Sequence, residues 1–168
     1  MRTLMTIVLW TSVLFSSSSY VYSSEGETPR ESEIFISDEK TELFTADPLG
    51  YIAKNFDIRK HSSFLEAKEE TEFLVSFKCF KGRLTAKFDD HGNLIYHTQK
   101  FNNIKVPVEI MSEVYRDFKG WEVVNIDYKA HGKGDSVDKA VYKLTLQKND
   151  QQQLFTKKLN FRKNPLEK

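Results

Sequence analysis

The sequence is poor in the residues that build covalent and metal frameworks. Its 168 residues include one cysteine, four prolines and seven glycines. A single cysteine excludes an intramolecular disulfide and every metal site built from several thiolates. The formal charge is only +1, from 25 basic and 24 acidic residues, which excludes a globally basic nucleic-acid-binding protein and a globally acidic tail. The chain is instead rich in phenylalanine, with 13 of them, and this favours a folded core over disorder.

Long hydrophobic runs are also lacking. The apolar stretch near the N-terminus, Leu4–Phe15, has 12 residues, whereas a bilayer-spanning helix needs about 20. It follows Arg2 and precedes a serine-rich segment that ends in Val21-Tyr22-Ser23, which is the order of a secretory signal. We therefore predict a signal peptide over residues 1–23. The mature protein is then exported, periplasmic or secreted, and has no membrane span.

The near-zero charge is the sum of two opposite regions. Residues 24–47 hold eight acids and two bases, a net charge of −6, while residues 48–168 hold 22 bases and 16 acids, a net charge of +6. Residues 24–33 contain Pro29 and have no apolar periodicity, which is typical of a flexible linker. We predict an acidic leader over 24–47 ahead of a basic domain over 48–168. The sequence leaves open whether the leader docks on that domain.

Two segments space their apolar residues at i, i+3, i+4 and i+7, the pattern of one helix face. They are Leu49, Ile52, Ala53 and Phe56, and, 62 residues later, Met111, Val114, Tyr115 and Phe118. Asp47 and Pro48 are a suitable N-cap and first residue for the first helix. Pro107 opens the second helix, and Gly120 ends it. The spacing predicts two short helices.

Strand-like segments follow each predicted helix. Apolar and polar residues alternate within them, and they cover Glu72–Phe80, 84–88, Leu94–Phe101, Trp121–Ala130, 140–147 and Leu154–Phe161, with Ile58–Ala67 a weaker case. Turn residues separate them at 81–82, 89–93, 131–135 and 149–150. We therefore predict an α+β fold of two tandem helix-plus-antiparallel-meander repeats, with the helices packed on β-sheet. Repeat 1 covers about 48–103 and repeat 2 about 104–163.

Three segments carry a resemblance to a known family. They are Lys87–Ile95 (KFDDHGNLI), Val106-Pro107, and Tyr115–Val123 (YRDFKGWEV). Together they resemble the PepSY-like domains, also called β-lactamase-inhibitor-protein-like, which Bacteroidetes-type bacteria typically export. The resemblance covers roughly residues 48–163 and implies two αβ repeats with no catalytic centre. The family often closes its second repeat with a Phe-Asp-x-x-Gly turn, whereas this chain ends that region with Asn160–Pro165.

Residues with reactive side chains do not form a recognisable catalytic or metal set. Cys79 shares strand parity with Phe73, Val75 and Phe77, which predicts a buried, inert thiol. The four histidines show no i, i+4 pair of a helical metal site. The segment 89–93 fits a hairpin turn better than a calcium loop, because Lys100 stands where the twelfth-position glutamate would be. We expect no enzyme, no cofactor and no metal site.

Basic residues dominate the C-terminal part of the chain. From Lys129 to Lys168 there are ten bases and four acids, and a basic sheet face beside tyrosines could bind an acidic protein or an anionic glycan. The residues predicted for this face are Tyr128, Tyr142, Lys143, Lys157 and Lys158.

Our leading hypothesis is a non-catalytic exported binding or inhibitory module that takes a periplasmic or extracellular protein partner. The alternative is a carrier of a small apolar ligand held between helices and sheet, or an anionic-glycan-binding protein. Nucleic acid is not expected, since the chain has no RNP-like motif or recognition helix.

Overall fold

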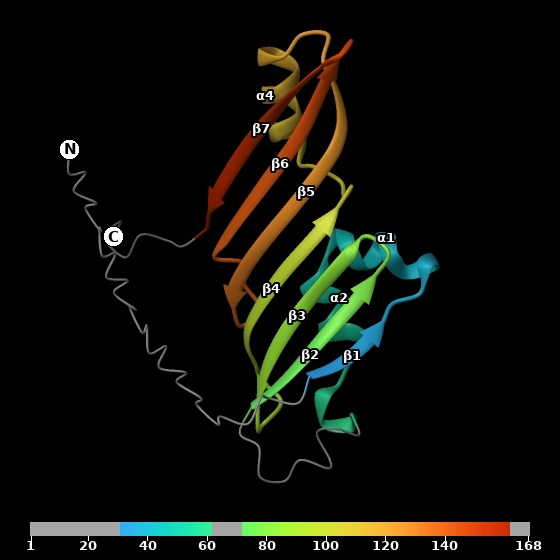
Figure 1. The fold of residues 1–168 in the computed structure, drawn as a ribbon. Helices are drawn as coiled ribbons and strands as arrows, with labels where there is room; N and C mark the ends of the chain where they lie inside the picture. Colours follow the sequence, from blue (N-terminus) through green and yellow to red (C-terminus); the bar gives the residue numbers. More distant parts are fainter. Residues whose placement is uncertain (1–30, 62–71, 162–168) are drawn as a thin grey trace, which may run out of the picture.

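The computed structural model describes residues 31–61 and 72–161, in which seven strands form one sheet in chain order (Figure 1). The strands are β1 Glu31–Phe35, β2 Glu72–Cys79, β3 Gly82–Asp89, β4 Leu94–Asn102, β5 Glu122–Lys133, β6 Lys139–Lys148 and β7 Gln151–Asn160. The helices are α1 Asp38–Ala46, α2 Pro48–Asn55, the 3-10 helix η1 Ile58–Lys60, and α4 Val108–Asp117. Helices α1, α2 and α4 lie behind the same face of the sheet in Figure 1. None of the helices within the described ranges is long and apolar enough to cross a membrane.

The prediction of two tandem helix-plus-meander repeats is wrong. Strands β4 and β5 pair antiparallel from Tyr96↔Lys133 to Asn102↔Asp127, so one sheet continues across the predicted boundary between residues 103 and 104. At one edge of the sheet, β1 pairs with β2 in parallel, which makes the sheet mixed. The helical spacing located both predicted helices, but alternation within a strand does not say which strand pairs with it.

The acidic leader has regular structure where it is described, because Glu31–Phe35 form β1 and Asp38–Ala46 form α1. Phe44 of α1 is fully buried, and its ring meets Tyr51 and Phe101 edge-on at centroid distances of 5.4 and 5.6 Å. Thr41, one turn earlier in α1, and the adjacent Thr45 are buried with it. The described part of the leader is therefore docked on the domain, while the predicted signal peptide, residues 1–23, lies outside the described residues.

The two predicted helices are confirmed, and local contacts explain where they begin. The Asp47 carboxylate accepts a hydrogen bond from the Gly50 backbone N–H at 3.0 Å, and Pro48 occupies the first turn of α2. Helix α4 ends at Asp117, and Gly120 then takes a φ of +76°, a conformation that favours glycine. The weak strand prediction for Ile58–Ala67 is wrong where the chain is described, since η1 occupies Ile58–Lys60.

Register divides the side chains of the sheet between two faces. The covered face is the one that packs against the helices, and its fully or nearly buried apolar residues are Phe73, Val75, Phe77, Leu84, Ala86, Phe88, Phe101, Ala130, Ala140, Tyr142, Leu144 and Leu146. The residues between them point to the opposite side, the open face. Cys79 is half-buried and packs against the core.

Candidate functional site

A line of basic side chains crosses the open face from strand to strand. Register pairs Lys78 of β2 with Arg83 of β3, Arg83 with Lys100 of β4, and Lys100 with Lys129 of β5. Lys129 is opposite Val141 of β6, and Val141 is opposite Lys158 of β7. We call Lys78, Arg83, Lys100, Lys129 and Lys158 the cation row. Directly opposed side chains have Cβ atoms about 5 Å apart, so the row is continuous from β2 to β5, whereas Val141 of β6 separates Lys129 from Lys158.

Only one member of the cation row has a carboxylate partner among the described residues. Lys78 forms an ion pair with Glu33 of β1, whereas Arg83, Lys100, Lys129 and Lys158 form none there. These four side chains are exposed. Like charges directly opposite one another destabilise a sheet. The row therefore has an electrostatic cost that an anionic partner would relieve.

Exposed aromatic residues lie at the β1–β2 end of the row. Phe35 of β1, 75% exposed, is opposite Lys78 in the register, and the Lys78 Nζ lies 5.9 Å from the centre of its ring. Phe80, 66% exposed, directly follows β2, and the Lys81 Nζ lies 5.9 Å from its ring centre. We call Phe35 and Phe80 the aromatic end. Large apolar side chains left this exposed are typical of interaction surfaces when they adjoin other contact groups.

The five residues predicted as a binding face do not form one site. Lys143 and Lys158 are exposed on the open face, as expected. Tyr128, Tyr142 and Lys157 share a register row on the covered face, where the two tyrosine rings lie 4.8 Å apart. Lys157 there forms an ion pair with Glu113 of α4 at 2.5 Å. Strand alternation puts Lys157 and Lys158 on opposite faces, so the prediction of one shared face is wrong for this pair.

The two tyrosines line a cavity of about 350 Å³ on the covered face. It lies between α1 and the segment 104–107 that leads into α4, and Gln99 of β4 also lines it. Burial raises the pKa of Tyr128 to about 12, and the neighbouring Tyr142 adds to this effect. Burial also raises the pKa of Tyr142. Both hydroxyls are therefore neutral hydrogen-bonding groups at physiological pH.

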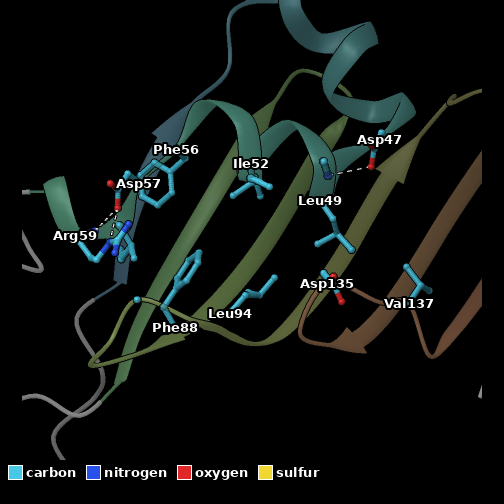
Figure 2. Close-up of a pocket in the computed structure, with 14 residues that line it drawn as sticks. Asp47, Leu49, Ile52, Phe56, Asp57, Arg59, Phe88, Leu94, Asp135 and Val137 are labelled. Atoms are coloured by element: carbon cyan, nitrogen blue, oxygen red, sulfur yellow. Dashed lines mark hydrogen bonds and ion pairs between the residues drawn. The ribbon is translucent and has the colours of Figure 1, made fainter.

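A larger groove of about 800 Å³ runs between α2, η1, the β3–β4 turn and the loop before β6. Figure 2 shows Leu49, Ile52 and Phe56 on the helix side facing Phe88 and Leu94 across it. We call this space the apolar groove. Its two ends differ, since Asp57 and Arg59 lie at one end and Asp47, Asp135 and Val137 at the other, as Figure 2 shows.

His97 is the buried histidine of the covered face, with no exposed surface. Its Nε2 lies 3.1 Å from the Ser136 carbonyl oxygen, and its Nδ1 lies 3.5 Å from the Gln99 amide nitrogen. A Cβ at Gly132 would come within 2.8 Å of this Nε2, so glycine lets β5 pass close to the ring. Burial lowers the pKa of His97. Both ring nitrogens are thus engaged in structural contacts, and neither contacts a nucleophilic side chain.

The β3–β4 turn brings three ligand-type side chains together. Atoms of Asp89, Asp90 and His91 lie within 4.8 Å of one another. The Asp89 carboxylate accepts hydrogen bonds from the Asn93 backbone at 2.7 Å, the Asn93 amide at 2.9 Å and the His91 backbone at 3.0 Å. These bonds lower the pKa of Asp89, those from Asn93 most. The contacts fit the hairpin turn expected from the sequence.

No protein-family model, curated protein or solved structure matches this chain. The resemblance to PepSY-like domains therefore stays a prediction.

Proposed function

We propose that this chain is an exported, non-catalytic binding or inhibitory module whose open face takes an acidic protein partner. The observation that supports this function is the cation row. Four of its five members have no carboxylate partner among the described residues. Three of these four, Arg83, Lys100 and Lys129, stand side by side on β3, β4 and β5, and Lys158 of β7 follows beyond Val141 of β6. A line of uncompensated positive charge attracts anionic surfaces and accelerates their association.

The aromatic end favours a protein over an anionic glycan. Cations alone suffice to bind the sulfates or carboxylates of a polysaccharide, so those charged groups do not require the phenylalanines. Protein interfaces, in contrast, are enriched in aromatic anchors that insert into apolar recesses of the partner. Phe35, 75% exposed, lies directly opposite Lys78 of the row, and Phe80, 66% exposed, follows the end of β2. The expected partner therefore combines an acidic surface with an apolar recess.

The experiment is capture of exported proteins of the source organism on the immobilised chain, followed by affinity measurement with the protein captured. The open-face variant is Lys100→Glu with Lys129→Glu. Its matched control is Lys54→Glu with Lys105→Glu, which makes the same change of net charge at exposed residues outside the open face. We expect the open-face variant to lower the affinity by at least about tenfold and the control to leave it within about twofold.

Three results bear on the proposal separately. Loss of capture with Phe35→Ala supports a protein partner, since that change leaves the cations in place. Equal losses for the open-face variant and its control would show that only net charge matters and would overturn the site. A hydrolase activity of the purified protein that disappears with His97→Ala or Cys79→Ala would overturn the non-catalytic function.

A further inference from the structure

The apolar groove is a second site, and it lies on the covered face, away from the cation row. Its sides are mainly aliphatic and aromatic, from α2 and η1 on one side and from β3, β4 and the loop before β6 on the other. Its volume of about 800 Å³ is within the range of small-molecule sites, roughly 300–1,000 Å³. We propose that the groove binds a small linear amphiphile with an amine head group and an alkyl tail.

The charges around the groove favour a cationic head group. Its lining holds three carboxylates and one guanidinium. Arg59 already pairs with Asp57 at 3.1 Å, and Lys60 lies 3.8 Å from the same carboxylate. Asp47 and Asp135 form no ion pair with any described residue. Asp47 caps α2 through the Gly50 N–H, but the two carboxylates that lack a cationic side-chain partner among the described residues both lie at the same end of the groove.

This asymmetry sets the direction of the ligand. An ammonium group would lie between Asp47 and Asp135, which Figure 2 places at the same end of the groove. The tail would then run past Ile52 and Leu94 toward Phe56 and Phe88, whose ring centroids are 6.1 Å apart. Each buried methylene adds roughly fourfold to the affinity if the tail is fully removed from water. A fatty acid of the same length would place its carboxylate against two others.

The experiment compares three probes of equal tail length, n-decylamine, decanoate and n-decanol, below their micelle concentrations. Calorimetric titration of the purified protein gives the affinity for each, with decanol kept below its solubility limit because it forms no micelles. We expect decylamine to bind at least about tenfold more tightly than decanoate, because the head group is attracted in one case and repelled in the other. Decanol, which is uncharged, should lie between them.

Variants test the acidic end of the groove and its helix side. Asp135→Asn and Asp47→Asn should each lower decylamine affinity by about twofold to fivefold and leave decanol unchanged. Asparagine also serves as an N-cap, so the second change keeps the start of α2. Asp150→Asn, in the exposed β6–β7 turn, is the charge-matched control and should have no effect. Ala53→Trp, at an exposed residue of α2 that lines the groove, should abolish binding of all three probes.

Any one of three results would overturn this inference. They are equal affinities for decylamine and decanoate, no binding of decylamine at all, and undiminished binding of decylamine by the Ala53→Trp protein. The Asp135→Asn comparison is made in an exposed loop residue and does not depend on repacking of the core. Because the groove and the cation row are on opposite faces of the sheet, either proposal can fail without the other.

Discussion

The covered and open faces of the sheet belong to the same strands but carry different kinds of side chains. In β4, Gln99 and Phe101 are buried on the covered face, and Lys100 between them is exposed. Across the covered face the side chains pack on α1, α2 and α4 with ring contacts and few charges. Across the open face, Arg83, Lys100 and Lys129 oppose one another, and none of these three has a carboxylate partner among the described residues. We infer that the covered face supplies stability, while the open face gives up some stability for binding.

The largest expected change in the free energy of unfolding comes from a substitution in the core, on the covered face. Phe44→Ala removes a fully buried ring that contacts Tyr51 and Phe101, and such a truncation costs about 3–5 kcal/mol of the free energy of unfolding. Urea denaturation followed by circular dichroism measures it. A loss below about 1 kcal/mol would mean that α1 contributes little to the core and that the leader is only loosely attached.

Phe35→Ala is the matched change of the same residue type at an exposed place. Because Phe35 is 75% exposed, the free energy of unfolding should stay within about 0.5 kcal/mol of the unmodified protein. Partner capture should fall all the same. A pair of phenylalanines only nine residues apart in the chain would then separate stability from binding.

The next prediction concerns how the stability of the protein depends on pH through His97, the buried histidine of the covered face. Burial lowers the pKa of His97 below its ordinary value of 6.5, although the Ser136 carbonyl and Asp138 act in the opposite direction. A histidine with a lowered folded-state pKa is charged more readily in the unfolded chain. Its contribution to stability is therefore full above pH 6.5 and is lost as the pH falls below that value toward the folded-state pKa.

Urea denaturation at several pH values tests this dependence. The free energy of unfolding should fall more steeply below pH 6.5 in the unmodified protein than in His97→Gln, which has no titrating ring. His91 is the comparison on the exposed turn, where hydrogen bonding to Asp90 raises its pKa, so its effect has the opposite sign. Identical pH profiles for the unmodified protein and His97→Gln would show that His97 is not buried as described.

Local features of the fold were predictable from the sequence because they depend on neighbouring residues. The start of α2 follows from Asp47 and Pro48, and the alternation of β6 correctly placed Ala140, Tyr142, Leu144 and Leu146 on one buried face. Pairing between distant segments was not predictable in this way. The parallel β1–β2 pair and the β4–β5 pair depend on packing and register, and no pattern within either strand specifies its partner.

The same limit explains why the candidate site was only partly predicted. Lys143 and Lys158 were correctly expected on an exposed face, because strand parity is a local property. Arg83, Lys100 and Lys129 were missed, since each is an ordinary exposed lysine or arginine until the register lines them up. Tyr142 follows the buried alternation of β6 but was also predicted for the binding face, because tyrosine suits either a core or a binding surface.

The smallest expected effect, and the most direct test of the comparison, is relief of repulsion in the cation row. Lys100 lies opposite Arg83 on one side and Lys129 on the other, so Lys100→Gln removes two unfavourable contacts. We expect the free energy of unfolding to rise by about 0.2–1 kcal/mol at low ionic strength. The gain should shrink as added salt screens the charges, which urea titrations at low and high sodium chloride would measure.

Lys54→Gln is the control for this last change, since Lys54 is exposed on α2 and has no opposed cation in the sheet. Its effect should be near zero and independent of salt. A stability loss in Lys100→Gln would mean that the protein itself compensates the row. If stability instead rises while partner affinity falls, the two effects have opposite signs at one residue. That result is expected only where a surface is kept strained in the free protein because a partner relieves the strain.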